Sequence, residues 1–179
     1  MKYFQDDHIM STTSEEQIIG AILYSADSPD YTLRSVIFTD KQVLQIPLSK
    51  MSELVGRVSG APAVAAWLLE AMNPATFSGL GGLVGMKMWS NLKKKVSDKP
   101  VVRLEKGVIP TELLNAGTSK LPYDEIKEVK VKKVVMSSDW LLSLSAGFLH
   151  SKKIVIEGRA VDGVKNLIKS TPLAPKLKE

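Results

Sequence analysis

The sequence contains no cysteine, and only two of its 179 residues are histidines. Without cysteine the chain has no disulfide framework and no thiolate chemistry, which suits a reducing compartment. His8 and His150 have no further metal ligand spaced to join either of them. We therefore predict no metal site, and nothing in the sequence implies a cofactor.

Motifs of catalysis are missing as well. No serine stands in a nucleophile-elbow motif, and the glycine-rich segment 81–85 lacks the Lys-Ser or Lys-Thr ending of a phosphate-binding loop. Members of a Ser/His/Asp triad need not be adjacent in sequence, so a hydrolase that uses His150 is kept as a residual alternative. We predict that the chain is not an enzyme, and we assign no catalytic residue.

The N-terminus lacks the pattern of a secretory signal, in which a basic region precedes an apolar one. Residues 1–16 are instead acidic and polar, and we expect them to be flexible. We expect a cytoplasmic location, with the inner face of the membrane as the alternative.

Arginine is also scarce, and the net charge of +5 comes mainly from lysine. Residues 1–86 are acidic overall, whereas the chain from residue 87 onward is basic. Such placement can attract a protein to anionic lipid or nucleic acid, or it can serve only to make one face soluble. Glu125 and Glu128 interleave with the lysines, and nucleic-acid sites usually use arginine and stacking aromatics, so nucleic acid is not a predicted partner.

Two groups of β-strands are predicted. Residues 17–24, 31–39 and 42–48 are apolar or rich in β-branched residues and are separated by short turn clusters, which predicts an antiparallel meander. Residues 126–135 alternate valine with lysine, as in a strand with one wet face, and the alternation slips at 133–135, which suggests a bulge.

The C-terminal region is predicted to form a hairpin and a helix. Residues 140–148 read as a strand, residues 150–153 as a hairpin turn, and residues 154–156 as the returning strand. Asp162 is predicted to cap a short helix. The apolar stripe of that helix consists of Val164, Leu167 and Ile168. Residues 171–179 are predicted to form a flexible tail.

Residues 49–98 between the two groups of strands do not resemble strand material. Apolar residues recur there at helical spacing, residues 63–72 are strong helix formers, and Asn73-Pro74 predicts a break. We therefore predict an inserted helical hairpin. Its many glycines indicate close backbone approach, so we predict that the insert binds a second copy of the chain or another protein. The candidate partner-binding residues are Trp67, Gly79, Gly81, Gly82, Gly85 and Trp89.

The alternative is a peripheral membrane protein. A helix that spans a bilayer needs about 20 apolar residues, and neither half of the insert reaches that length without Pro, Gly or a charge. A shallow hairpin would place tryptophans at the interface and lysines at anionic lipid headgroups. The candidate lipid-binding residues are Lys87, Lys93, Lys94 and Lys95. A helical pair packed on the chain's own strands is the other open interpretation.

Three segments resemble the bacterial and archaeal pleckstrin-homology-like (PH-like) domain family. Residues 36–44 resemble its strand–turn–strand signature, residues 121–129 resemble its I-P-Y-x-x-I segment, and residues 154–168 resemble its last strand and closing helix. The resemblance implies an α+β fold: a small antiparallel β-barrel or sandwich capped by a C-terminal helix. Residues 17–170 would then form a single domain with a helical insert at 49–98.

The resemblance also implies a non-enzymatic binding or scaffolding module. Members that bind phosphoinositides resemble one another in having a basic first turn. Residues 25–30 of this chain instead carry Asp27 and Asp30 and no base, and Gln42 stands where many relatives carry arginine. The chain therefore lacks the basic first turn that the phosphoinositide-binding members share, and phosphoinositide binding is not predicted for it.

Overall fold

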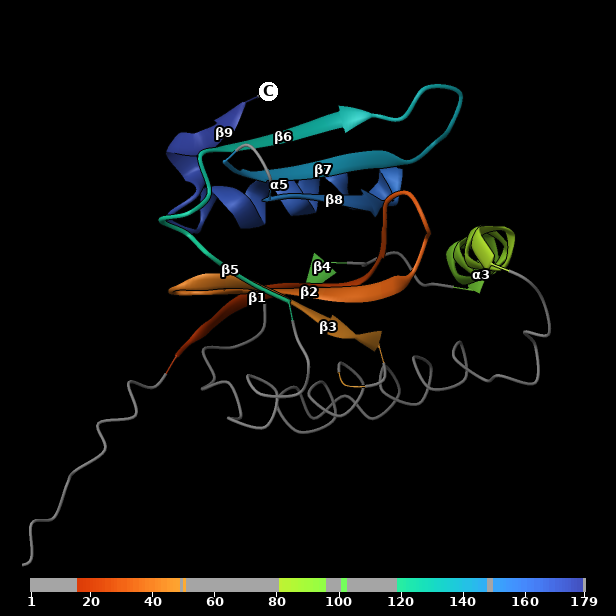
Figure 1. The fold of residues 1–179 in the computed structure, drawn as a ribbon, viewed down its shortest axis with the longest axis horizontal. Coiled ribbons are helices and arrows are strands. Elements are labelled where there is room, and N and C mark those ends of the chain that lie inside the picture. The colour runs from red at the N-terminus through yellow and green to blue at the C-terminus, as the bar shows by residue number, and fades with distance from the viewer. Residues whose placement is uncertain are drawn as a thin grey trace, which may run out of the picture.

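A computed structural model describes residues 16–48, 50, 81–95, 101–102, 119–147 and 150–178. These residues form an α+β fold (Figure 1), which confirms the predicted class. Its elements are β1 (Ile18–Asp27), β2 (Leu33–Thr39), β3 (Gln42–Pro47), α3 (Gly81–Lys95), β4 (Val101–Val102), β5 (Ser119–Pro122), β6 (Glu128–Lys133), β7 (Trp140–Ala146), β8 (His150–Ile156), α5 (Val161–Lys169) and β9 (Leu177–Lys178), with 3₁₀ turns η2 (Gly158–Ala160) and η3 (Ala174–Lys176).

The predicted N-terminal meander is confirmed. Strands lie in the order β5-β3-β2-β1, each antiparallel to its neighbour. Strand β1 is longer than predicted, because it continues through Ser25 to Asp27 before the chain turns. β2 alternates between two buried faces, so both sides of this layer are apolar, as expected when a sheet is covered on both faces.

Strands β6, β7 and β8 form a second antiparallel layer above the first (Figure 1). The layers are joined where the end of β1 pairs with β8, at Ala26 opposite Val155 and Asp27 opposite Ile154. The strand order therefore runs continuously as β5-β3-β2-β1-β8-β7-β6-β9. The sheet folds over on itself, and its two groups of strands enclose one shared interior.

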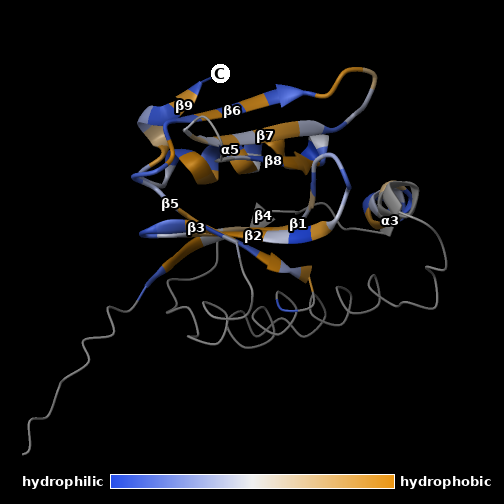
Figure 2. Cartoon of the chain, in the orientation of Figure 1, coloured by the Kyte–Doolittle hydropathy of each residue, from blue (hydrophilic) through white to orange (hydrophobic). Residues whose placement is uncertain are grey.

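The central core, defined here as the cluster between the two layers, is closed by α5. Its buried residues come from the inward faces of both layers and from one face of the helix. Val164, Leu167 and Ile168 of α5 are all buried in it, which confirms the predicted stripe. Figure 2 shows hydrophobic residues on the strands of both layers and on α5. Burial of each such side chain contributes about 1.5–3 kcal/mol.

The predicted hairpin turn at residues 150–153 is wrong. These residues belong to β8, where Ser151 pairs with Ser145 and Lys153 pairs with Ser143. The turn comes earlier, and Gly147 takes a φ of +75° that side chains other than glycine rarely adopt. The polar residues 150–153 suggested a turn, but polar residues also occupy the solvent-facing side of a strand.

Both ends of the described fold are more ordered than predicted. Glu16 is buried and accepts a hydrogen bond from the Thr39 hydroxyl at 2.6 Å. Residues 177–178 of the predicted flexible tail pair in parallel with β6. The ammonium of Lys176 donates to the carbonyl oxygens of Tyr123 and Ile126 at 2.6 and 2.5 Å. Residues 1–15 lie outside the described residues.

The start of α5 also differs from the prediction. Asp162 lies in the first turn of the helix and makes no capping hydrogen bond, and the N-cap position is Ala160. The turn η2 leads directly into α5, so the helix begins from backbone that is already coiled. A side-chain cap is therefore not needed to start it.

Candidate functional site

Helix α3, the described part of the insert, packs on the chain's own strands. Trp89 is only 2% exposed and lies in an outer core, defined here as the cluster on the far side of β1–β3 from the central core. Leu92 is buried in the same cluster. The rings of Trp89 and Tyr24 have centroids 5.8 Å apart and tilted planes. An aromatic contact of this kind adds about 0.5–1.5 kcal/mol to simple burial.

A buried carboxylate anchors the helix to the connection between β6 and β7. Asp139 is 5% exposed. It accepts hydrogen bonds from Trp89 Nε1 at 3.0 Å and from Lys93 Nζ at 2.8 Å. The Ser137 hydroxyl donates to the same carboxylate at 3.0 Å. A buried charge is tolerated when it is paired and hydrogen-bonded in this way.

A second anchor joins α3 to η2. Arg159 donates to the carbonyl oxygen of Lys93 at 3.0 Å and to Glu157 at 2.6 Å. Glu157 also accepts a hydrogen bond from the phenol of Tyr24. Burial, followed by this hydrogen bond, raises the pKa of Tyr24 well above its ordinary value, so Tyr24 stays a neutral donor.

The prediction that Trp89 is exposed for a partner is therefore wrong. Its indole instead docks α3 on the sheet, because the indole N–H donates a hydrogen bond to Asp139 at the β6–β7 turn. Gly82 and Gly85 precede Trp89 by seven and four residues, so the helical repeat puts them on the docked face of α3. Gly81 also lies in α3, while Trp67 and Gly79 lie outside the described residues.

The predicted lipid-binding lysines have different surroundings. Lys93 is committed to Asp139, and its ammonium also lies 5.7 Å from the centroid of the Trp89 ring. Lys87 and Lys94 are exposed and seven residues apart, so they share one face of α3. Lys95 ends the helix, and its side chain lies outside the described residues. Lipid binding by these residues stays a prediction.

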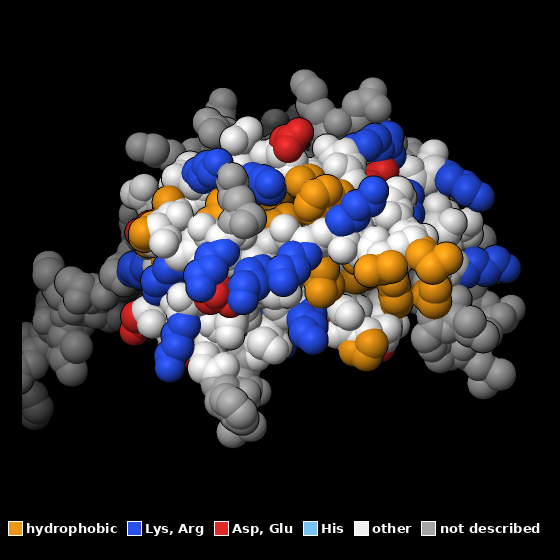
Figure 3. Space-filling model, turned by 90° about the horizontal axis from the view of Figure 1, so that it is seen from above, with side chains coloured by type: hydrophobic (Ala, Val, Ile, Leu, Met, Phe, Trp, Pro, Cys, Tyr) orange, Lys and Arg blue, Asp and Glu red, His pale blue; other side chains and the backbone are white. Residues whose placement is uncertain are grey.

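A basic face, defined here as Lys130, Lys132 and Lys153, lies on the outer side of β6–β8. Lys130 and Lys153 both pair with Ser143, one from each side, so their side chains share a face. Lys132 follows two residues after Lys130 and points the same way. Figure 3 shows Lys and Arg side chains spread over this face of the molecule.

Two carboxylates of the β6–β7 hairpin are neutralised by lysines. Glu128 pairs with Lys130 and Lys178, and these ammonium groups lower the pKa of its carboxyl to about 2. Asp139 is buried against Lys93. Among the described residues, Lys132 and Lys153 have no ion pair. The face therefore carries an uncompensated positive charge.

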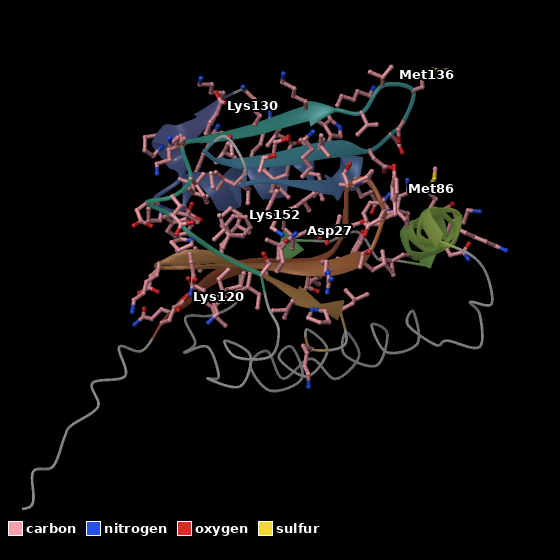
Figure 4. All side chains as sticks on the ribbon, in the orientation of Figure 1. Asp27, Met86, Lys120, Lys130, Met136 and Lys152 are labelled. Atoms are coloured by element: carbon pink, nitrogen blue, oxygen red, sulfur yellow. The ribbon has the colours of Figure 1, made fainter. Side chains whose placement is uncertain are left out.

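An apolar tip, defined here as Val135 and Met136, projects from the turn between β6 and β7 (Figures 1 and 4). Val135 is 86% exposed and Met136 is 102% exposed. Exposed Lys132 and Lys133 end the strand that leads into the tip. Met86 of α3 is also half exposed and lies at the same end of the molecule in Figure 4.

The sequence interpretation missed this tip. The strand predicted at 126–135 ends at Lys133, and the predicted bulge is instead the start of the turn. The available signal was the pair Val135-Met136 directly before the turn cluster 137–139. Two large apolar residues are unusual at such a position, because turns favour small and polar residues.

Other chemical sites are not found in the described part of the chain. It holds no group of three or more His, Asp and Glu side chains that could bind a metal ion. None of its helices combines the length and apolar character needed to cross a membrane. His150 lies in β8, and its side chain, like all of His8, is outside the described residues.

Comparison of the chain with protein-family models, with curated proteins and with solved structures gives no match.

Proposed function

We propose that this chain is a non-enzymatic PH-like binding domain that docks peripherally on an anionic membrane surface. The strand order supports the PH-like part of the proposal. Strands β1, β2, β3 and β5 form one antiparallel layer, and β6, β7 and β8 form the second. Helix α5 closes the space between the two layers. The resemblance in sequence implies the same order of elements. Fold alone does not give function, so the surface has to carry the rest.

The observation that carries the membrane proposal is the combination of the basic face and the apolar tip on one surface. Lysines near an anionic leaflet contribute about 1 kcal/mol each. Lys130, Lys132 and Lys153 share one face, and Lys133 is exposed beside the tip. Figure 3 presents hydrophobic side chains gathered next to the lysines. This pairing of cations with apolar groups matches the chemistry of a lipid interface.

The first turn, between β1 and β2, offers a different environment. Asp27 pairs with Arg34 at 3.4 Å and accepts a hydrogen bond from Gln45 at 2.8 Å. Asp30 is hydrogen-bonded to Thr32, which lowers the pKa of its carboxyl and keeps it ionised. This acidic turn is poorly suited to anionic headgroups, which favours the basic face as the docking surface.

Self-association through the insert stays a prediction. It now depends on Trp67, Gly79 and Gly81, because Trp89 is buried within its own chain and shares its face of α3 with Gly82 and Gly85. Light scattering of the full chain, compared with a Trp67→Ala variant, would measure it directly. No described residue favours self-association through the insert over membrane docking through the basic face.

Co-sedimentation with lipid vesicles tests the membrane proposal. The full chain should bind vesicles of phosphatidylcholine and phosphatidylserine at low salt and bind phosphatidylcholine alone far more weakly. A Lys132→Glu/Lys153→Glu variant should lose at least about tenfold in affinity, since two charges are reversed.

The matched control is Lys120→Glu. Lys120 is exposed on β5 in the opposite layer, and Figure 4 labels it on the side of the molecule away from Lys130. It should bind vesicles as the wild-type chain does. The proposal fails if the wild-type chain does not bind anionic vesicles at low salt, or if the control loses as much affinity as the double variant.

A further inference from the structure

We infer that the apolar tip inserts into the lipid bilayer, with Val135 and Met136 entering the boundary between headgroups and acyl chains. This inference rests on the membrane docking proposed above and names the element that penetrates. It assigns the basic face to attraction and the apolar tip to insertion. The two roles can be separated by experiment, because they reside on different side chains.

Exposure of the tip is the first argument. Apolar residues exposed singly are common on protein surfaces, whereas Val135 and Met136 are adjacent, large and almost fully exposed at a projecting turn. No described residue covers them. Transfer of two such side chains from water to an apolar phase is favourable in proportion to their area.

Backbone conformation is the second argument. Met136 has a φ of +60°, in the left-handed region that favours glycine or asparagine. A turn selected only for stability would carry one of those residues there. A large apolar side chain at a strained position points to selection for a surface property.

The tip is also pre-organised. Val134 donates its backbone N–H to the Asp139 carbonyl oxygen at 2.9 Å, and Ser137 donates to the Val134 carbonyl oxygen at 3.3 Å. The Asp139 N–H donates to the Ser137 hydroxyl at 3.1 Å. These bonds close the turn around Val135 and Met136, so insertion does not require the loop to be ordered first.

Charge next to the tip selects a bilayer as the occupant. Lys132 and Lys133 stand three residues before Val135 and Met136 respectively, at the end of β6. When the tip enters the membrane, long lysine side chains can extend back to anionic headgroups while their stems stay in apolar surroundings. A lipid interface offers anionic headgroups for the lysines and, next to them, acyl chains for the tip. Nucleic acid offers the anionic groups but no apolar phase for the tip.

The absence of cysteine allows a direct test. A single Met136→Cys variant of the full chain can carry one nitroxide label, and Lys120→Cys provides the matched label on the opposite layer. Collision with oxygen, which concentrates in the bilayer, is compared with collision with a water-soluble nickel chelate. On addition of phosphatidylserine-containing vesicles, we expect the ratio of the oxygen collision rate to the nickel-chelate collision rate to rise at position 136. At position 120 the same ratio should not change.

Affinity provides the second measurement. An unlabelled Val135→Ser/Met136→Ser variant should bind the same vesicles at least about tenfold more weakly, while its attraction to a soluble polyanion is unchanged. Wild-type binding together with a water-exposed label at position 136, or an unchanged affinity of the double variant, would overturn insertion and leave docking in place. Failure of the wild-type chain to bind would overturn docking, and the inference with it.

Discussion

Met136 combines an unfavourable backbone conformation with a fully exposed apolar side chain. Met136→Asn should therefore raise the free energy of unfolding by about 0.5–1 kcal/mol, since asparagine tolerates the left-handed region better. Urea denaturation measures this change. Val135→Asn is the matched control, because Val135 does not have a positive φ and should gain nothing. A less stable Met136→Asn chain would contradict the account, as would tighter vesicle binding.

Gly158 lies where the start of η2 meets the turn between β6 and β7. A Cβ at this position would stand 2.4 Å from the carbonyl oxygen of Ser138, which is backbone and cannot rotate away. Gly158→Ala should therefore lower the free energy of unfolding by about 1–3 kcal/mol. Thermal or urea denaturation checks the value, and a variant of wild-type stability would mean that the two segments are not in contact.

Glu128 gives a prediction for pH. Its carboxyl pKa is lowered from 4.5 to about 2 by Lys130 and Lys178, so the charged form is favoured in the folded state. The resulting stability is fully present above pH 4.5 and is lost as the pH falls toward 2. Glu128→Gln should flatten the dependence of unfolding on pH in that window. An NMR titration of Glu128 with an ordinary midpoint would rule this out.

One carboxylate at the base of the β6–β7 turn, that of Asp139, accepts hydrogen bonds from two side chains of α3. Asp139→Ala would leave the ammonium of Lys93 and the indole N–H of Trp89 without their acceptor. We expect a loss of about 3 kcal/mol in the free energy of unfolding, because one partner of a largely buried ion pair is removed. Asp162→Ala, an exposed aspartate without a capping bond, should change it by less than about 1 kcal/mol. Equal effects on urea denaturation would contradict this assignment.

Elements with a strong local pattern could be predicted from the sequence. Strands β1 to β3 follow from β-branched and apolar runs between turn clusters, and the buried face of α5 follows from the spacing of Val164, Leu167 and Ile168. Both patterns arise from residues that are neighbours in the chain. Their physical causes, side-chain shape and periodic burial, are therefore visible without coordinates.

Elements that depend on distant partners could not be predicted. Trp89 is buried because Asp139, fifty residues away in the chain, accepts its hydrogen bond. Strand β9 forms because residues 177–178 reach β6, and such a short strand has no period of its own. The apolar tip was hidden for a related reason, since a slipped alternation at 133–135 is compatible with a bulge or a turn.

At the scale of the whole molecule, the proposed lipid-binding groups belong to the β6–β7–β8 layer, which presents the basic face and the apolar tip. The outer core lies mainly on β1–β3 and also includes Val155 of β8, and α3 is held by this core and by Asp139 and Arg159. Figure 1 places the turn between β6 and β7 at one end of the upper layer. We therefore predict an oriented contact with the membrane, in which the tip lies deepest and β5 remains in water.

Hydrogen exchange of the full chain, with and without phosphatidylserine-containing vesicles, tests this orientation most directly. We expect slower exchange of backbone amides in residues 133–139 when vesicles are added, and unchanged exchange in β5. Protection of β5 with none in residues 133–139 would contradict it, as would exchange that is unchanged throughout at low salt.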